Sequence, residues 1–198
     1  YQPFKSTAEG LGRKVLESEL IETDGYYTIN FEDFEAKASQ SKLFIMCSPH
    51  NPMGRVWTQE ELLEIERICT KHDVIVVSDE IHCDLILPGY KHHIYADLND
   101  QAKKHSIICT STSKSFNLAG LKNSNIFIPN ESLRNRYVSC VEGDGSGTLS
   151  TNSLGRYATT VAYNQCEAWL DDFIETIEAN HDFVNNYIKT NIPVLKSL

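Results

Sequence analysis

Short apolar runs recur along this chain and are separated by longer amphipathic stretches. Three of these runs hold apolar residues side by side, a pattern typical of strands that are buried on both faces of a sheet. Two more are rich in β-branched or aromatic residues, which also favours strands. The predicted strands are 26–29, 43–47, 74–77, 106–109 and 125–128.

Most of the remaining stretches carry apolar residues at helical spacing. The best-defined helix covers 58–72, where Thr58 and Glu61 make the capping box T-x-x-E at the start. Asn130 is expected to cap a later helix, and a turn is expected at 22–25. The other predicted helices are 6–17, 31–39, 131–141, about 152–164 and about 167–190.

Strands that alternate with helices indicate an α/β fold, here a three-layer α/β/α arrangement around a mostly parallel sheet. The stretch at 146–153, which reads SGTLSTNS, is the best loop candidate. The YQPF start without a methionine suggests a fragment of a longer protein. We therefore expect residues 1–165 to be part of one large domain, and residues 166–198 to form a long helix that leads toward a second, smaller domain.

Charge and composition restrict the partners. The net charge is −9 and no basic cluster occurs, which disfavours nucleic acids and anionic membranes, because both require concentrated lysine and arginine. No apolar run approaches the length of about 20 residues that a membrane span requires. The start of the chain shows no signal-peptide pattern. These features predict a soluble, cytoplasmic protein.

The cysteine and histidine patterns argue against a metal site. Six cysteines occur and none forms a C-x-x-C pair, so we expect reduced, buried thiols in a cytosolic protein. Adjacent histidines occur only at His92 and His93, in a polar stretch, and we expect neither to bind a metal.

Unusual polar residues follow three of the predicted strands. The stretches are SPHNPMG at 48–54, SDEIHCD at 78–84 and TSTSKSFN at 110–117. Ligands of open α/β sheets bind beyond the carboxyl ends of the strands. Taken alone, Asn51 could belong to a turn, Asp79 could cap a helix, and Lys114 could be a surface charge. Their occurrence at equivalent strand ends favours one shared site.

These motifs, together with STSKSFNLAGL at 111–121, resemble the fold type I pyridoxal-phosphate enzymes of the class I/II aminotransferase type. The order Asn51, Asp79, Lys114 agrees with that family, as do the intervals of 28 and 35 residues. The wording DEIH-x-DL and HNPxGRVWT is most similar to bacterial cysteine-S-conjugate β-lyases, also called cystathionine β-lyases. Ordinary aminotransferases usually carry a tyrosine where this chain has His82.

The resemblance implies pyridoxal 5'-phosphate as the cofactor and Lys114 as the amine that holds it. A lysine can also move protons at the α-carbon of a substrate once burial or a nearby charge lowers its pKa. Asp79 would keep the pyridine nitrogen of the cofactor protonated. Ser111 and Ser113 would bind the phosphate as neutral donors.

Four more positions follow from the resemblance. The Asn51 amide would donate to the phenolate oxygen of the cofactor, and His82 would add a second contact there. Tyr1 lies where the family has an aromatic residue stacked on the ring. Lys122 stands where aminotransferases often have an arginine on the phosphate, and a lysine lacks the two-pronged geometry of arginine.

The implied reaction is cleavage of the C–S bond of cystathionine or another cysteine S-conjugate to a thiol, pyruvate and ammonia. The family also implies a homodimer with a shared active site, which the 146–153 loop would reach. Its glycine-rich phosphate turn and its substrate-binding arginine fall outside this chain. Two alternatives remain at this point: an aminotransferase on the same scaffold, and a non-catalytic regulatory protein that retains the fold.

Overall fold

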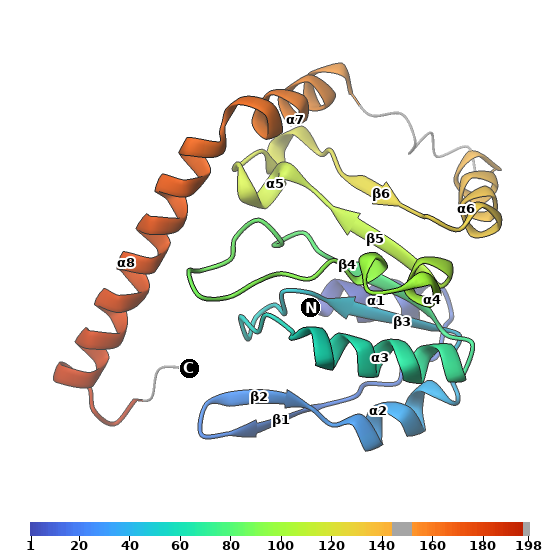
Figure 1. Ribbon diagram of the computed structural model, residues 1–198, viewed down its shortest axis with the longest axis horizontal. Helices are drawn as coiled ribbons and strands as arrows, with labels where there is room; N and C mark the ends of the chain where they lie inside the picture. Colours follow the sequence, from blue (N-terminus) through green and yellow to red (C-terminus); the bar gives the residue numbers. More distant parts are fainter. Residues whose placement is uncertain (144–151, 196–198) are drawn as a thin grey trace.

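The centre of the molecule is a four-stranded sheet with the order β3-β4-β5-β6 (Figure 1). The computed structural model describes residues 1–143 and 152–195. The strands of the sheet are β3 (Leu43–Cys47), β4 (Ile75–Asp79), β5 (Ser106–Thr110) and β6 (Asn125–Phe127). The first three run parallel, and β6 runs antiparallel to β5. The predicted α/β fold with a mostly parallel sheet is therefore confirmed.

The antiparallel direction of β6 follows from its short connection to β5. A parallel return requires a crossover along the whole length of the sheet, usually a helix. The connection here holds only two short turns of helix, α5 (Thr112–Ser115) and η2 (Ala119–Leu121). The chain therefore turns back at the edge where β5 ends and enters β6 in the opposite direction.

Helices cover the sheet on both faces. Figure 1 shows α3 (Gln59–Lys71) and α4 (Asp100–Lys104) in front of the strands, with α1 (Gln2–Gly10) behind them. The helix α2 (Phe31–Ala38) contacts α3, and the short η1 (Tyr95–Asp97) contacts β5. The core that they enclose includes Phe34, Met46, Trp57, Leu62, Ile65, Ile68, Val74, Val76, Tyr95 and Ile108.

The start of α3 is formed as its sequence predicts. The Glu61 backbone N–H donates to the Thr58 hydroxyl at 3.2 Å, and the Thr58 N–H donates to the Glu61 carboxylate at 2.8 Å. These two bonds satisfy N–H groups that a helix terminus leaves without intrahelical partners. The buried face of α3 holds Leu62, Ile65 and Cys69, the predicted stripe.

A small antiparallel hairpin of β1 (Leu20–Thr23) and β2 (Tyr26–Ile29) lies beside the main sheet. The first of these strands is absent from the sequence prediction. Its outer positions are exposed, so it lacks the apolar run that marks a buried strand. The expected turn is confirmed at Asp24 and Gly25, which both have positive φ.

Arg55 joins this hairpin to α3. Its guanidinium makes two hydrogen bonds of 2.8 Å to the Glu61 carboxylate and another to the Tyr27 carbonyl. The same group lies 4.2 Å above the Tyr26 ring and 4.8 Å from the Trp57 ring. Arg55 is only 8% exposed, so these contacts satisfy a charge that is almost completely buried.

The helix predicted at 6–17 is wrong in its position. The observed helix begins at Gln2 and ends at Gly10. Pro3 suits the first turn, where its missing N–H breaks no helical bond. Gly12 has a φ of +69°, a left-handed conformation that ends the helix before the predicted end.

Three helices complete the described chain: α6 (Glu131–Gly143), α7 (Ser153–Gln165) and α8 (Glu167–Asn191). Asn130 caps α6 as predicted, with its Oδ1 3.1 Å from the Leu133 N–H. Residues 146–151 of the expected loop lie outside the described residues, and Asn152 caps α7. The last helix runs from Glu167 to Asn191, in agreement with the predicted 167–190, and buries none of its residues.

The cysteines differ in part from the expectation. All six are free, as predicted, but only Cys69 is buried and Cys140 is exposed on α6. Cys140 follows no apolar run, so its position gives no signal of burial. Within residues 1–143 and 152–195, no helix combines the length and the apolar character needed to cross a membrane.

Candidate active site

The three polar stretches leave the sheet at one edge. Cys47 at the end of β3 pairs in register with Asp79, and Asp79 pairs in turn with Cys109 on β5. Adjacent strands lie about 4.8 Å apart, so these three residues form a short row with their side chains on the same face. The arrowheads of β3 and β5 in Figure 1 mark this edge. The predicted meeting of the three strand ends is confirmed.

Asp79 lies at the centre of that row. Burial raises the pKa of its carboxyl above the ordinary value, and the Ile81 N–H, 3.2 Å from Oδ1, opposes this effect. The thiols on either side are uncharged at neutral pH, because burial raises the pKa of Cys47 and raises that of Cys109 to about 11. The charge of His82 lowers the pKa of Asp79 and that of Glu80 raises it, and the largest effect on this carboxyl is burial. A buried carboxyl of this kind is suited to pair with a cationic ligand group.

His82 lies close to both charged members of the predicted site. Burial lowers the pKa of its imidazole, the charge on Lys114 lowers it further, and the charge on Asp79 acts in the opposite direction. These interactions place the imidazole near the amine and the acid. His82 is therefore neutral at pH 7 and can donate a hydrogen bond without adding a second positive charge beside Lys114.

Lys114 is the exposed residue of the short turn α5. Its amine makes no hydrogen bond and no ion pair with any residue in 1–143 or 152–195. Its neighbours in the turn are better held, since Thr112 and Ser115 are both buried. An exposed amine on a firmly held turn suits covalent attachment of an aldehyde.

Ser111 and Ser113 differ in whether their hydroxyls are free to donate a hydrogen bond to a phosphate. The Ser111 hydroxyl accepts from the Ser113 N–H at 3.0 Å and donates to the Asn123 carbonyl at 2.6 Å. A hydroxyl has one hydrogen, so Ser111 would have to break the second bond before donating to a phosphate. The half-buried Ser113 hydroxyl has no such bond within the described residues, and its role as a phosphate donor stays a prediction.

Asn51 and Tyr1 both lie near the end of β3. The Asn51 backbone interacts with the Cys47 thiol, the register neighbour of Asp79. The backbone nitrogen of Tyr1 lies near the His50 imidazole. The Tyr1 ring is 63% exposed and contacts Phe4 edge-on at 5.2 Å. The amide contact and the ring stacking expected of them stay predictions.

Among the candidate site residues, Lys122 has the least structural connection to the others. It is exposed, follows η2, and has a φ of +49°. Its neighbour Asn123 accepts the Ser111 hydrogen bond, which places this segment beside the start of α5. No interaction of the Lys122 amine with the other candidate residues is found in the described chain. Its contact with phosphate stays a prediction.

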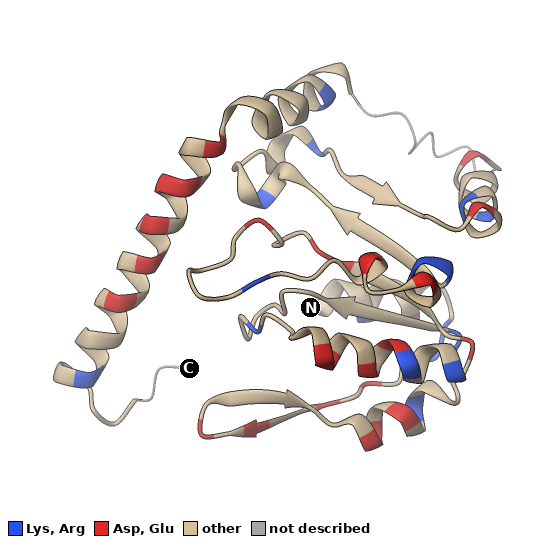
Figure 2. Cartoon of the chain, viewed as in Figure 1, with Lys and Arg blue, Asp and Glu red and all other residues tan. Residues whose placement is uncertain are grey.

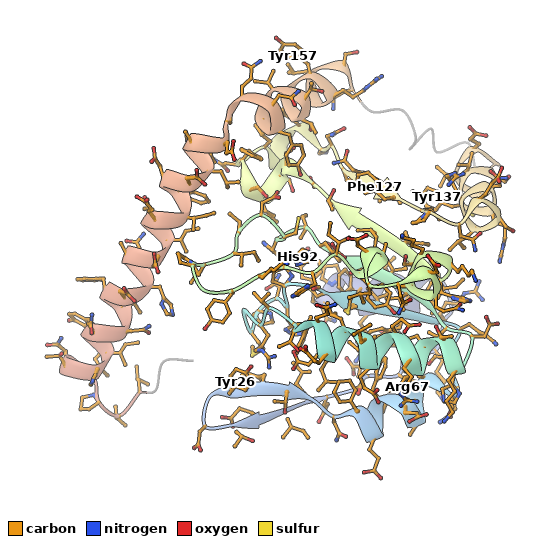
Figure 3. All side chains as sticks on the ribbon, in the orientation of Figure 1. Tyr26, Arg67, His92, Phe127, Tyr137 and Tyr157 are labelled. Carbon is orange, nitrogen blue, oxygen red and sulfur yellow. The ribbon has the colours of Figure 1, made fainter. Side chains whose placement is uncertain are left out.

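Glu80 and His92 form a buried network that the sequence pattern did not reveal. The Glu80 carboxylate is 1% exposed and accepts bonds from the Ser78 hydroxyl at 2.9 Å and the Tyr95 N–H at 3.0 Å. His92, which is labelled in Figure 3, contacts the same carboxylate at 2.9 Å. Glu80 thus holds the 80–95 loop in place. The described residues contain no group of side chains able to hold a metal.

The donor set at this edge fits pyridoxal phosphate. It combines an amine, a buried carboxyl between neutral thiols, and an imidazole with a lowered pKa, at Lys114, Asp79 and His82. Asn51 adds an amide side chain, and Ser113 adds a hydroxyl that has no hydrogen-bond partner among the described residues. These groups match the aldehyde, the pyridine nitrogen, the phenolic oxygen and the phosphate of that cofactor.

Comparisons with known proteins also indicate a link to pyridoxal phosphate. The chain is 42% identical to cystathionine beta-lyase PatB of Bacillus subtilis (strain 168), over 100% of this chain and 51% of that protein. The crystal structure of cystalysin from Treponema denticola, which contains a pyridoxal 5'-phosphate cofactor, matches with a TM-score of 0.94 and 38% identity, over 100% of this chain and 50% of that one.

A pyridoxal-phosphate-bound C-S lyase from Staphylococcus hominis matches with a TM-score of 0.85 and 36% identity, over 98% of this chain and 48% of that one. The chain therefore spans about half the length of the relatives that it matches. The family model for aminotransferase class I and II matches residues 1–197. This chain belongs to the aminotransferase class I and II family.

Proposed function

We propose that this chain is the cofactor-binding part of a pyridoxal-phosphate-dependent C–S β-lyase. Its substrate would be cystathionine or another cysteine S-conjugate, cleaved to a thiol, pyruvate and ammonia. The observation that supports this proposal is that the segments carrying Asp79, His82 and Lys114 follow two neighbouring parallel strands, with the charges of Asp79 and Lys114 both acting on the His82 imidazole. The similarity to cystathionine beta-lyase PatB and to the C-S lyase of Staphylococcus hominis supports the lyase rather than another reaction of the family.

Each residue has a defined part in that reaction. Pyridoxal phosphate, when bound, supplies an electron sink for the α-carbon of the substrate. The Lys114 amine holds the aldehyde covalently and moves the proton at the α-carbon. The Asp79 carboxylate, ionised beside the cationic ring nitrogen, keeps that nitrogen protonated. The Asn51 amide and the neutral His82 imidazole donate to the phenolic oxygen.

The remaining contacts orient the cofactor. Ser113 donates to the phosphate, with Ser111 joining if its bond to Asn123 opens, and Lys122 adds a positive charge. Tyr1 would supply an aromatic ring against the cofactor. The α-carboxylate of the substrate is left without a partner by these residues, so the rest of the full-length protein must supply one.

The whole protein would contain more than this chain. Residues 1–165 would belong to the large domain, and the helix within 166–198 would lead to the second domain. Apolar side chains exposed along α8 support this assignment, because a cover for them is expected. They are Trp169, Phe183, Val184 and Tyr187. We also propose a homodimer and a cytoplasmic location, the latter because six free cysteines suit a reducing compartment.

Borohydride reduction of the full-length protein, followed by peptide mapping, tests the site. We expect a pyridoxyl group on Lys114, and its loss in Lys114→Ala. Lys104→Ala is the matched control, because Lys104 is an exposed lysine on α4, away from the strand ends. A pyridoxyl group on another lysine would overturn the assignment of the site.

A second assay separates the lyase from the aminotransferase, the alternative that the family model equally supports. The full-length protein is given cystathionine without any keto acid, and pyruvate is measured. A lyase releases pyruvate continuously, whereas an aminotransferase makes little without an amino acceptor. A regulatory protein without activity would release none, and the presence of both Lys114 and Asp79 argues against it.

A further inference from the structure

The residue after Lys114 is held more firmly than Lys114 itself. Ser115 is 0% exposed, and its hydroxyl donates a hydrogen bond of 2.6 Å to Oδ2 of Asp84. Asp84 lies in the segment that continues from Asp79, the last residue of β4, and also carries His82. One bond therefore joins the turn that carries the amine to the segment that carries the acid and the imidazole.

Asp84 also interacts with α7. Burial raises the pKa of Tyr163 to about 12, and the nearby Asp84 carboxylate contributes to this shift. The phenol stays protonated at neutral pH and directs its hydrogen toward that carboxylate. Its ring meets the Phe116 ring edge-on, with 5.7 Å between centroids. Asp84 is thus held between α5 and α7.

Other contacts hold the turn without Asp84. The Thr112 hydroxyl lies 3.1 Å from the Thr159 hydroxyl on α7, and the Asn123 amide donates to the same Thr159 oxygen at 2.8 Å. The Phe116 ring stacks on Trp169 of α8 at 6.0 Å. Loss of the Ser115–Asp84 bond alone should therefore shift the turn rather than unfold it.

We propose that Ser115 and Asp84 are positioning residues, whose hydrogen bond sets the place of the Lys114 amine relative to Asp79 and His82. The inference rests on the proposed function, because it concerns how Lys114 meets the cofactor. Hydroxyl-to-carboxylate bonds are shorter and stronger than those between neutral groups, which suits this role. Ser115 follows Lys114 directly in the chain, so a change at Ser115 alters the backbone from which the amine projects.

The test compares cofactor-free, full-length variants in two measurements. The first is the affinity for pyridoxal phosphate, followed by fluorescence. The second is the pH midpoint of the absorbance change of the bound cofactor, which a purely structural role would leave unchanged. We expect Ser115→Ala and Asp84→Ala each to weaken binding about tenfold and to move the midpoint by about one pH unit. Asp84→Asn keeps an oxygen that can accept the hydrogen bond. It should restore most of the cofactor affinity and bring the pH midpoint most of the way back.

Ser106→Ala is the matched control. Ser106 is also 0% exposed and lies at the opposite end of β5, and its hydroxyl has no hydrogen-bond partner in the described chain. The double variant Ser115→Ala/Asp84→Ala should be no worse than Asp84→Ala alone, because that variant already lacks the Ser115–Asp84 bond.

Two results would overturn the inference. One is a Ser115→Ala protein that matches Ser106→Ala in both measurements. The other is weaker binding with an unchanged pH midpoint, which would show a structural role only. Failure of the proposed function looks different, because borohydride would then leave no pyridoxyl group on Lys114 of the unchanged protein.

Discussion

The buried Asp79 carboxyl lowers the stability of the folded protein at neutral pH. Burial raises the pKa of its carboxyl, so the folded chain binds this proton more tightly than the unfolded chain does. As the pH rises from the ordinary aspartate pKa of about 3.9 through the raised folded value, the free energy of unfolding falls. The loss persists at neutral pH until a cationic partner pairs with the carboxylate.

Asp79→Asn should therefore stabilise the cofactor-free protein at pH 7 and weaken the binding of pyridoxal phosphate. The binding loss should be tenfold or more, because a charge-assisted hydrogen bond contributes about 1.5–3 kcal/mol. Urea unfolding from pH 3 to 8 and a cofactor titration measure the two effects. Asp171→Asn, at an exposed site on α8, is the control. Equal stability of variant and parent at pH 7 would contradict the argument.

His82→Phe tests the neutral imidazole. The ring is of similar size but cannot donate a hydrogen bond, and one such bond contributes about 1 kcal/mol, or roughly fivefold in cofactor affinity. His82→Tyr restores a donor and should recover most of that affinity. Fluorescence titration of the cofactor measures both. A His82→Phe protein with unchanged affinity would show that the imidazole has no contact with the cofactor.

At the scale of single helices and strands, the sequence prediction was correct where a capping motif or an apolar run marked the element. The capping box of α3 and the apolar runs of β3, β4 and β5 were predicted within two residues of their observed bounds. Prediction failed for β1, which is exposed, and for α1, where Gly12 ends the helix early. Sequence periodicity reports burial on a regular face, so elements without such a face give little signal.

Thr58→Ala should lower the free energy of unfolding by about 1 kcal/mol, because it removes the acceptor for the Glu61 N–H. Thr58→Ser retains the acceptor and should lower the free energy of unfolding by only a small part of this amount. Urea unfolding gives the values. Thr176→Ala is the control, since Thr176 lies within the exposed helix α8 and caps nothing. An equal loss in the Thr58 and Thr176 variants would mean that the cap adds no stability.

At the scale of the whole molecule, two contacts between distant segments decide the arrangement. Arg55 joins the β1–β2 hairpin to α3, and the 110–123 segment is held against α7 by Thr159. Figure 2 shows acidic residues along α8, and Figure 3 shows Tyr157 on α7 directed away from the sheet. The outer face of α7 and much of α8 are thus exposed parts of the described surface.

Arg55→Met should lower the free energy of unfolding by about 3 kcal/mol, because it leaves the Glu61 carboxylate without its buried partner. Arg67→Met is the matched control. That arginine is 52% exposed and pairs with Glu64 at the surface, where an ion pair contributes about 0.5 kcal/mol. Chemical denaturation measures both. Similar losses in the two variants would show that the hairpin is not held by Arg55.

The sequence by itself determined the fold class, the order of the main strands and helices, and the three stretches that supply the candidate site. It could do so because helical periodicity, apolar runs and capping residues act between near neighbours in the chain. Only the tertiary structure decided the direction of β6 and the lowered pKa of His82. It also decided the hydrogen bond of the Ser111 hydroxyl to Asn123 and the contacts of Asp84 and Arg55. Each of these depends on residues that lie far apart in sequence and meet only when the chain is packed, where burial and nearby charges set their properties.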